Sequence, residues 1–391
     1  MYSKTRFGQL LEGLPRSVFD RHVGDLNADK YSKGFRRWDQ LLAMIFAQVS
    51  GVKSLRELET AFNQQSVHHY HLGTRSIKRS TLSDANANRS SDVFSQICNE
   101  LMKAVHRKLR KELGGMLYLL DSTSISLAGP GFDDWAGQYR NNVSQGLKLH
   151  LMIEGRESIP VFIKITGVQS SDIKNGRAIE LESDAIYLFD MGYYDYNWWH
   201  EIEQIGSTFV TRLKKNANVR VCKHYPIPSD AEHMLEDAEI VMNNRYVKSR
   251  TENNAYYGKL LRRITVDRPD KDTPMILVTN NFELSAEEIA GLYKKRWGIE
   301  LFFKWIKQNL KIKTYLGRSE NAVRTQIYTA LISYLLLYFY RQKQTGKISF
   351  KLCLSALRYS LFQRMKTEQI VHKRERQRRD YLDEIQPQLA I

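Results

Sequence analysis

The sequence lacks the cysteine patterns of disulfide-rich and zinc-binding proteins. Its 391 residues include three cysteines, which are odd in number and lie far apart, at Cys98, Cys222 and Cys353. Spacings of this kind give neither a disulfide framework nor a set of zinc ligands. Because disulfides persist mainly in oxidising compartments, the pattern is typical of a protein of the reducing cytoplasm.

The sequence also lacks the long apolar runs of secreted and membrane proteins. The first residues, Met-Tyr-Ser-Lys-Thr-Arg, do not resemble the apolar core of a secretory signal. The most apolar stretch, 327–340, includes Thr329 and Ser333. A membrane-spanning helix needs about 20 apolar residues. We therefore predict a buried core helix at 327–340, no membrane partner and a cytoplasmic location.

Acidic residues are outnumbered. Lys and Arg total 59 against 43 Asp and Glu, so the net charge is +16 and the isoelectric point is near 9.5. Such an excess suits a polyanion, and charge alone leaves nucleic acid, a ribosome and a membrane surface open as partners. Residues 341–379 hold twelve Lys or Arg and two Glu. This bias exceeds what a solvated helix face needs, so it favours nucleic-acid contact.

The N-terminal segment 1–110 shows helical periodicity. Within it, 38–49 has apolar residues at helical spacing and ends before Gly51. Ser54 and Glu57 have the spacing of a capping box that begins a second helix, and a third helical region covers 80–102. Two helices around a glycine turn are typical of a helix-turn-helix, but many helical bundles share this pattern. DNA reading by this region therefore stays one of two hypotheses.

From about residue 115 the apolar period changes to that of strands. Five short runs are predicted strands, at 116–120, 147–153, 160–166, 185–189 and 208–213. With a helical gap at 173–184, these runs indicate an α/β layer. Polar loops then separate three further strand-like runs, which indicate a β-rich insertion, at 239–242, 260–266 and 275–279.

Two aspartates end predicted strands. Asp121 closes the run 116–120, and Asp190 closes the run 185–189. A carboxylate at a strand end can project from the edge of the sheet, where ligands of α/β proteins commonly bind. A single aspartate in such a place is more often a turn or helix cap, so neither residue identifies a site by itself.

A third acidic residue lies on a predicted helix. The capping box Ser285-x-x-Glu288 begins a long helix that reaches Leu310. At about 100° per residue, four side chains share one stripe of this helix, namely Tyr293, Arg296, Glu300 and Lys307. The stripe could be a solvated face with pairing between positions four residues apart. Taken with the two aspartates, however, it favours a site.

Three carboxylates among basic residues suit phosphodiester chemistry. Carboxylates can hold two divalent ions about 4 Å apart, which activate a water or a 3′-hydroxyl and stabilise the departing oxygen. Hard oxygen ligands favour Mg²⁺, with Mn²⁺ as a substitute. The sequence has no Walker-type glycine loop, so no nucleoside triphosphate site is expected.

The helix motif resembles that of a known family. Tyr293-x₂-Arg296-x₃-Glu300-x₆-Lys307 is similar to the Tyr-Arg-Glu-Lys signature of bacterial insertion-sequence transposases of the DDE superfamily, insertion-sequence four family. The segments Leu119-Leu120-Asp121-Ser122-Thr123 and Phe189-Asp190-x-Gly192-Tyr193 strengthen the resemblance. So do the sequence intervals from Asp121 to Asp190 and from Asp190 to Glu300, of which the second is the longer. The resemblance covers roughly residues 5–365.

The resemblance implies an active site. Asp121, Asp190 and Glu300 would be the catalytic residues and the ligands of two Mg²⁺ ions. Tyr293, Arg296 and Lys307 would contact DNA at the transposon end. Arg212 and Lys214 close the predicted strand beyond Asp190, and they either line the path of the DNA or form a solvated strand end.

The resemblance also implies a fold, an RNase H-like α/β core with a β-rich insertion, flanked by helical N- and C-terminal regions. Five segments are expected in chain order. The first is a helical, DNA-binding N-terminal domain at 1–110, followed by the first part of the core at 111–218 and the insertion at 219–283. The second part of the core, with Glu300, covers 284–340, and a basic helical C-terminal region covers 341–391.

The activity implied is cut-and-paste transposition by a homodimer on DNA, with transposon ends and target DNA as partners, at the bacterial nucleoid. Family members cut through a DNA hairpin, with a flipped base stacked on a tryptophan of the insertion. This sequence has no Trp between Trp199 and Trp297. The candidates for that stacking role are Trp198, Trp199, Tyr256 and Tyr257.

Two other functions fit the sequence. One is a metal-dependent DNA nuclease on the same fold, which cuts without joining strands. The other is a non-catalytic DNA-binding protein. The latter does not need acidic residues at Asp121, Asp190 and Glu300, so the presence of all three favours an enzyme.

Overall fold

The computed structural model describes residues 4–127, 129–136, 145–229, 231, 233–247, 252–269, 271–310, 314–344 and 348–364. The chain forms two compact units. The first combines Met1–Leu101 with Asn309–Ile391, and the second is Met102–Gln308. The chain therefore leaves the first unit, builds the second and returns to the first.

The first unit is helical. In chain order its elements are α1 (Arg6–Leu11), α2 (Arg16–Asp25), α3 (Arg37–Ser50), α4 (Leu55–Asn63), η1 (Ser66–His68), α5 (His69–Leu72), α6 (Arg79–Asn88), α12 (Glu320–Gln342) and α13 (Phe350–Ser360). Helix α7 (Asp92–Glu112) begins in this unit and continues into the second. Ser54 caps α4 by accepting the Glu57 N–H at 3.1 Å, as its sequence spacing predicts.

Two buried helices, α3 and α12, form the core of the first unit. All residues of α3 from Arg37 to Val49 are buried, and most of α12 is buried as well. The predicted core helix at 327–340 is therefore confirmed. Because α12 packs against α1, α3, α6 and α13, it groups with the first unit, although the sequence analysis placed it in the segment 284–340. Within the described ranges, no helix is long and apolar enough to span a membrane.

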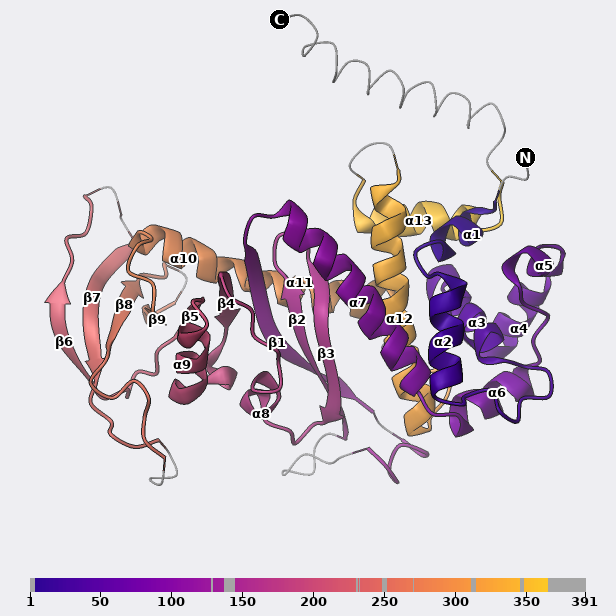
Figure 1. Ribbon diagram of the computed structural model, residues 1–391, viewed down its shortest axis with the longest axis horizontal. Helices are drawn as coiled ribbons and strands as arrows, with labels where there is room; N and C mark the ends of the chain where they lie inside the picture. Colours follow the sequence, from indigo (N-terminus) through magenta and orange to yellow (C-terminus); the bar gives the residue numbers. More distant parts are fainter. Residues whose placement is uncertain are drawn as a thin grey trace, which may run out of the picture. The chain divides into compact units, whose positions relative to one another are not determined.

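The second unit is built on one nine-stranded sheet (Figure 1). Its strands are β1 (Met116–Ser126), β2 (Gly146–Glu154), β3 (Ile159–Gly167), β4 (Ala185–Phe189), β5 (Thr208–Arg212), β6 (Val219–His224), β7 (Met234–Met242), β8 (Leu260–Val266) and β9 (Met275–Thr279). Their order is β3-β2-β1-β4-β5-β9-β8-β7-β6. The first three pair antiparallel, and β4 and β5 run parallel to β1. The predicted RNase H-like α/β core is confirmed.

The strands β6 to β9 are the predicted β-rich insertion, and they extend the same sheet. β9 pairs antiparallel with β5, so the insertion leaves the core after β5 and returns beside it. Three of its four strands agree with the predicted ones. The sequence analysis missed β6, because this edge strand is mostly exposed and has no apolar run.

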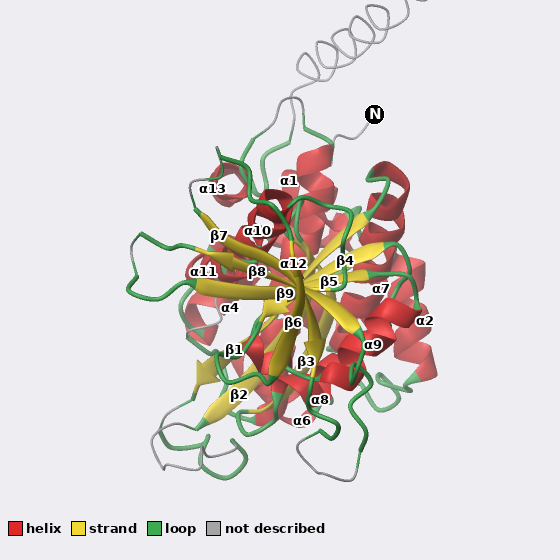
Figure 2. Ribbon diagram, turned by 90° about the vertical axis from the view of Figure 1, so that its left-hand side faces the viewer, coloured by secondary structure: helices red, strands yellow, loops and turns green. Residues whose placement is uncertain are grey.

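Helices cover both faces of the sheet at β5. On one face lies α9 (Tyr196–Gln204), where the ring centroids of Trp199 and Phe209 are 5.2 Å apart. On the other lies α10 (Ala286–Lys295), which also contacts β7 and β8. Figure 2 shows these helices on opposite sides of a sheet whose strands fan out through the usual twist. The helix α10 thus spans the junction between core and insertion.

A buried ion pair fixes the insertion to the start of α10. Arg262 on β8 donates to the Asp237 carboxylate on β7 at 2.8 and 2.7 Å, and both side chains are 7% exposed. Arg262 also donates to the Leu284 carbonyl at 2.5 Å. Leu284 precedes Ser285, the N-cap of α10. The pair therefore connects the insertion to the helix that leads toward Glu300.

We expect Asp237→Ala to lower the unfolding free energy of the second unit by about 3–5 kcal/mol. The substitution leaves the Arg262 guanidinium buried without its carboxylate. Thermal unfolding followed by circular dichroism measures the loss. Glu201→Ala removes an exposed carboxylate from α9 as a control, with an expected change within about 0.5 kcal/mol. If the two variants melt alike, the ion pair does not secure the insertion.

Candidate active site

Strand pairing places the first two candidate carboxylates side by side. β1 and β4 are parallel neighbours, and their pairing ends at Leu120 and Phe189. Asp121 and Asp190 are the next residues on each chain segment. The predicted end of the first strand at Asp121 is wrong, because β1 continues along β2 to Ser126. The sheet therefore opens beside Asp121 only on the side of β4.

Asp190 turns the chain away from the sheet. It is the N-cap of the 3₁₀ turn η2 (Met191–Tyr193), and its carboxylate accepts the Gly192 N–H at 2.8 Å. A Cβ atom on Gly192 would lie 2.9 Å from Asp190 Oδ1 and 3.0 Å from Asp172 Oδ2. The absence of a side chain at this turn therefore lets two carboxylates approach it.

The third carboxylate comes from two consecutive helices that the sequence analysis predicted as one. The capping box at the start of α10 is confirmed, with reciprocal hydrogen bonds between Ser285 and Glu288. α10 ends before Arg296, which lies in a turn, and α11 (Trp297–Asn309) follows directly. Glu300 stands in the first turn of α11. Its position therefore depends on the junction at Arg296.

Arg296 joins this helix pair to the sheet. Its guanidinium donates to Glu300 Oε1 at 2.8 Å and lies 3.5 Å from Asp121 Oδ2. The three side chains are only partly exposed, at 15% for Arg296, 17% for Asp121 and 33% for Glu300. Two acids from separate elements thus share one guanidinium. With Asp190 beside Asp121, the fold brings all three predicted acids to one place.

The pKa of Asp121 reflects this crowding. Burial, followed by the negative charges of Asp190 and Glu300, raises the pKa of its carboxyl to about 6. The Ser122 N–H, 2.7 Å from Oδ1, and the charge of Arg296 oppose the shift without cancelling it. The ionised form of Asp121 is therefore disfavoured in the folded protein.

Lys307 and Tyr293, the other residues of the predicted stripe, also lie at this site. The Lys307 ammonium donates to the Thr123 hydroxyl at 2.5 Å and to the Ser124 carbonyl at 3.4 Å, so it holds α11 against β1 just beyond Asp121. Tyr293 is 6% exposed, and its ring centroid lies 5.8 Å from the Arg296 guanidinium. Its contact with DNA stays a prediction.

Arg212 and Lys214 border the same region. Burial raises the pKa of Tyr293, and the charges of Arg296 and Arg212 oppose this shift, which places Arg212 near the ring. The Lys214 ammonium lies 4.1 Å from the ring centroid of Tyr194, which follows the turn at Asp190. Their role in DNA binding also stays a prediction.

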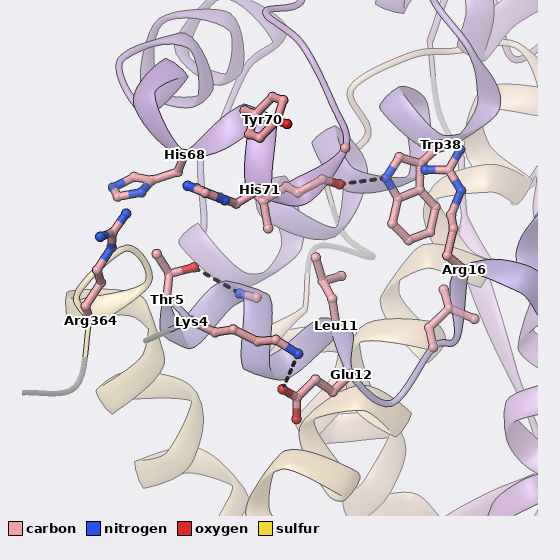
Figure 3. Close-up of a pocket in the computed structure, with 14 residues that line it drawn as sticks. Lys4, Thr5, Leu11, Glu12, Arg16, Trp38, His68, Tyr70, His71 and Arg364 are labelled. Carbon is pink, nitrogen blue, oxygen red and sulfur yellow. Dashed lines mark hydrogen bonds and ion pairs between the residues drawn. The ribbon is translucent and has the colours of Figure 1, made fainter. Parts of the chain in front are cut away.

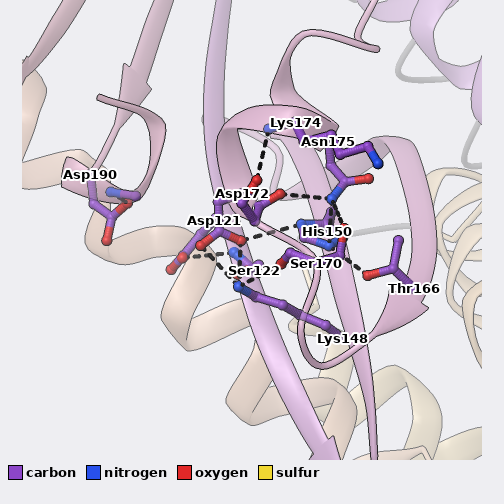
Figure 4. Close-up of polar contacts among 12 residues, drawn as sticks. Asp121, Ser122, Lys148, His150, Thr166, Ser170, Asp172, Lys174, Asn175 and Asp190 are labelled. Atoms are coloured by element: carbon purple, nitrogen blue, oxygen red, sulfur yellow. Dashed lines mark hydrogen bonds and ion pairs between the residues drawn. The ribbon is translucent and has the colours of Figure 1, made fainter. Parts of the chain in front are cut away.

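A fourth acid, Asp172, lies against the site and was missed by the sequence analysis. It begins α8 (Asp172–Gly176), its Oδ2 accepts a hydrogen bond from Lys148 Nζ at 3.0 Å, and its Oδ1 lies 3.3 Å from His150 Nδ1. Burial raises the pKa of Asp172, but hydrogen bonds from His150, Lys148 and Ser122 outweigh burial and lower it to about 2. Figure 4 shows this cluster beside Asp121.

Only the fold could reveal Asp172. Its sequence signal is the Ser171 N-cap of a short helix, which gives no hint of chemistry. His150 is 2% exposed and accepts a hydrogen bond from the Asn175 amide at 3.1 Å. Its other ring nitrogen, Nδ1, lies 3.3 Å from Asp172 Oδ1, so His150 contacts Asp172. Asp172, Lys148 and His150 form a polar network that borders the three acids through Ser122 and Gly192.

Three of the four aromatic candidates for base stacking are buried. Trp198, Trp199 and Tyr256 are each 0% exposed, and both tryptophans pack against Phe189. These residues belong to the core. Tyr257 is 51% exposed, and it is the one of the four that a base could reach.

The acids fit a divalent cation in their chemistry. All donors are carboxylate oxygens, which Mg²⁺ and Mn²⁺ prefer. Burial, followed by the charges of Asp190 and Glu300, raises the pKa of Asp121, and a bound cation would favour its ionised form. In the part of the chain that the structure describes, no three His, Cys, Asp or Glu side chains are arranged around a single metal position. Arg296 is instead the cation that Asp121 and Glu300 share.

Comparison with protein families assigns most of the chain. A family described as "Transposase DDE domain" matches residues 113–336, which contain Asp121, Asp190 and Glu300. A second family, "Domain of unknown function (DUF4372)", matches residues 2–75. The first match covers the whole described sheet and both helices of the site.

Three curated proteins are similar over about two thirds of the chain. The putative transposase y4zB of Sinorhizobium fredii is 40% identical over 66% of this chain and 69% of its own. The probable transposase for insertion sequence element IS5377 of Geobacillus stearothermophilus is 26% identical over 65% and 66%. The putative transposase for insertion sequence element IS4SA of Synechocystis is 26% identical over 66% and 70%.

One solved structure is similar over 92% of this chain and 80% of its own, with 10% identity and a TM-score of 0.49. It is described as a cryo-EM structure of the piggyBac transposase synaptic complex with hairpin DNA.

We expect Asp121→Asn to stabilise the metal-free protein at neutral pH. The folded-state pKa of about 6 exceeds the ordinary value of 3.8, so ionisation of Asp121 opposes folding by roughly 3 kcal/mol well above pH 6. The advantage of the variant should shrink as pH falls from about 6 toward 4, where the native carboxyl keeps its proton.

Thermal unfolding in EDTA at several pH values measures this difference. Asp133→Asn, at an exposed position, provides the control and should leave the unfolding midpoint unchanged. An Asp121→Asn protein that melts at or below the wild-type temperature at neutral pH would contradict the raised pKa of Asp121 in the folded protein.

Proposed function

Because this chain belongs to the DDE transposases of bacterial insertion sequences, we propose that Asp121, Asp190 and Glu300 form its active site. The chain is a DNA transposase, an enzyme that cuts DNA and transfers strands. Family membership does not favour the two alternatives, a nuclease without strand transfer and a non-catalytic DNA-binding protein. The proposal concerns which residues perform the chemistry.

The observation that carries the proposal is the convergence of three acids from distant segments of the sequence. Strand pairing sets Asp121 beside Asp190, and Arg296 ties Glu300 to Asp121. Like-charged side chains on a solvated surface can move apart. Here burial of Asp121, together with the charges of Asp190 and Glu300, raises the pKa of the Asp121 carboxyl. Such convergence suits residues that bind a cation together.

DDE transposases use divalent metal ions, and we propose two Mg²⁺ ions for this one, with Mn²⁺ as a substitute. Asp121, Asp190 and Glu300 are the residues that would hold them. Bound ions of this kind activate a water or a 3′-hydroxyl and stabilise the departing oxygen of a phosphodiester. The three carboxylates would supply negative charge and oxygen ligands at fixed positions for these ions.

The cations around the acids supply the affinity for DNA. Arg296 lies beside Glu300 at the start of α11 and Lys307 lies further along this helix, so a DNA phosphate that approaches along α11 meets two positive charges. Tyr293 supports Arg296 with its ring and completes the proposed contact set. Arg212 and Lys214 extend the positive surface from the end of β5 toward Tyr194.

Tyr257 is the proposed platform for a flipped base, if this transposase cuts through a hairpin. Stacking of a base on an aromatic ring contributes about 1–3 kcal/mol. The loop that carries Tyr257 is anchored to α9, where the Ala255 N–H donates to Asn197 Oδ1 at 2.9 Å. Because α9 follows the turn at Asp190, the loop is attached to the same part of the core as the acids.

We further propose that the protein acts as a homodimer on double-stranded transposon ends and target DNA. An excised element has two ends, and one set of three acids per chain serves one of them. The N-terminal segment 1–110 and the basic segment 341–391 are proposed to bind DNA as well. Of the latter, residues 345–347 and 365–391 lie outside the described residues.

We expect Asp121→Asn, Asp190→Asn and Glu300→Gln each to lower Mg²⁺-dependent nicking by at least about 100-fold. Each removes one proposed metal ligand and leaves the phosphate contacts in place, so DNA binding should stay near the wild-type level. Nicking is measured on a duplex that carries the terminal repeat of the element, and binding is measured in EDTA. Asp133→Asn serves as the control, and an acid variant that nicks at the control rate does not belong to the site.

The homodimer on DNA can be tested by stoichiometry. We expect mass photometry of the complex with paired terminal-repeat duplexes to show two protein chains, because two ends must be held together for joining. Full cleavage by a complex of one chain with one end would contradict the dimer. Monomer in the absence of DNA would not, since the proposal concerns the assembly on DNA.

A further inference from the structure

The first unit contains a groove outside the DDE domain. Two cavities of about 640 and 400 Å³ share Arg16, Trp38, Tyr70 and Gly73, so they form one continuous depression, called here the N-terminal groove. All four shared residues lie within 2–75, the match to a domain of unknown function. Figure 3 shows the larger cavity, with Arg16 against Trp38 and with Tyr70 beside His71.

The N-terminal groove presents positive charge. Its basic lining residues are Lys4, Arg16, Arg36, Arg75 and Arg364, against the acids Glu12 and Asp39. Glu12 pairs with Lys4 and Lys343, each at 3.0 Å. Asp39 is 4% exposed and accepts bonds from the Arg36 N–H and the Thr74 hydroxyl. Asp39 also lies 4.0 Å from Nε of Arg75. With five basic lining residues against two acids, the charge offered to a ligand is positive.

Arg16 is held in a fixed position within the groove. Its guanidinium lies 4.4 Å from the Trp38 ring centroid, and the Trp38 indole N–H donates to the Leu72 carbonyl at 2.9 Å. Both hydrogen bonds from Arg16 to Asp20 come from Nε. Its terminal nitrogens make no hydrogen bond to any residue that the structure describes. A guanidinium fixed in this way is prepared to bind a phosphate with little loss of side-chain entropy.

An exposed aromatic ring stands between the two cavities. Tyr70 lines both of them and is 88% exposed, so its ring has little packing role in this unit. At one end of the groove, burial lowers the pKa of His68, and the charges of Arg364 and His71 lower it further. That effect is consistent with a positive potential along the groove.

We propose that the N-terminal groove binds the phosphodiester backbone of duplex DNA. Arg16, Arg36 and Arg75 would contact phosphates, and Tyr70 would lie against a sugar between them. Three guanidinium groups are spread over two joined cavities. This arrangement suits a polyanion, whose charges repeat along its length, better than it suits a single small anion. The proposal rests on the DNA substrate of the family and is independent of the acids at the active site. It gives the domain of unknown function a role in holding DNA.

The test compares two triple variants that remove the same charge from the same unit. Arg16→Ala, Arg36→Ala, Arg75→Ala alters the groove. Arg21→Ala, Lys30→Ala, Lys33→Ala removes three exposed cations that do not line either cavity. Binding of a fluorescein-labelled duplex of mixed sequence, about 40 base pairs long, is measured in EDTA at several salt concentrations.

We expect the groove variant to lose at least about tenfold in affinity and its salt slope to fall by up to about three, since each phosphate contact contributes about 0.9. The control variant should lose no more than about threefold, because exposed charges away from the DNA are screened. Tyr70→Ala should weaken binding about fivefold and leave the slope unchanged, because a ring contact releases no counterion.

Equal losses in the two triple variants would overturn the proposal, and so would a loss confined to a single-stranded 40-mer. Circular dichroism melting checks folding. If the change at Arg16 disturbs Trp38, the pair Arg36→Ala, Arg75→Ala against Lys30→Ala, Lys33→Ala repeats the comparison without it. Asp121→Asn measured in the same EDTA buffer should bind as the wild type does, so a failed groove and a failed active site give different results.

Discussion

The parallel pairing of β1 and β4 is the interaction on which the proposed active site depends. It brings Asp121 and Asp190 to the same level of the sheet, at the point where the pairing stops and the sheet opens. Partial burial makes this arrangement unfavourable in the absence of a cation, and the pKa of about 6 for Asp121 records the cost. A site that disfavours its own negative charge is prepared to gain free energy when a metal ion binds.

The groups around the acids limit that cost in the metal-free protein. Arg296 lies between Asp121 and Glu300, and the Gly192 N–H bonds to Asp190. Hydrogen bonds from Lys148 and His150 stabilise the ionised form of Asp172. This fourth acid therefore has a low pKa, although it lies close to the other acids. The site therefore combines acids with raised and lowered pKa values. The difference arises because Asp172 accepts hydrogen bonds from His150, Lys148 and Ser122, while Asp121 shares one guanidinium with Glu300.

The path of the insertion explains how the chain returns to the core at Glu300 after the long segment that follows Asp190. It leaves after β5, builds three antiparallel partners and returns through β9, which pairs with β5 itself. The chain then enters α10 close to where it left the core, and Arg262 fixes this return by binding both Asp237 and the Leu284 carbonyl. The long segment between Asp190 and Glu300 therefore adds a sheet extension without separating the two acids.

The sequence by itself determined the strands before Asp121 and Asp190, the capping box of α10, the basic character of the chain and the Tyr-Arg-Glu-Lys spacing, because each of these is a local pattern. It could not determine that β1 continues past Asp121, since that depends on pairing with β2. Nor could it locate Asp172, whose neighbours Gly192, Ser122 and Lys148 come from three other segments. The burial of Trp198, Trp199 and Tyr256 was likewise decided only by packing. Local propensity acts through residues a few positions apart, whereas the contacts that set charge, exposure and approach in this site join residues from distant parts of the chain. Only the tertiary structure brings those residues together.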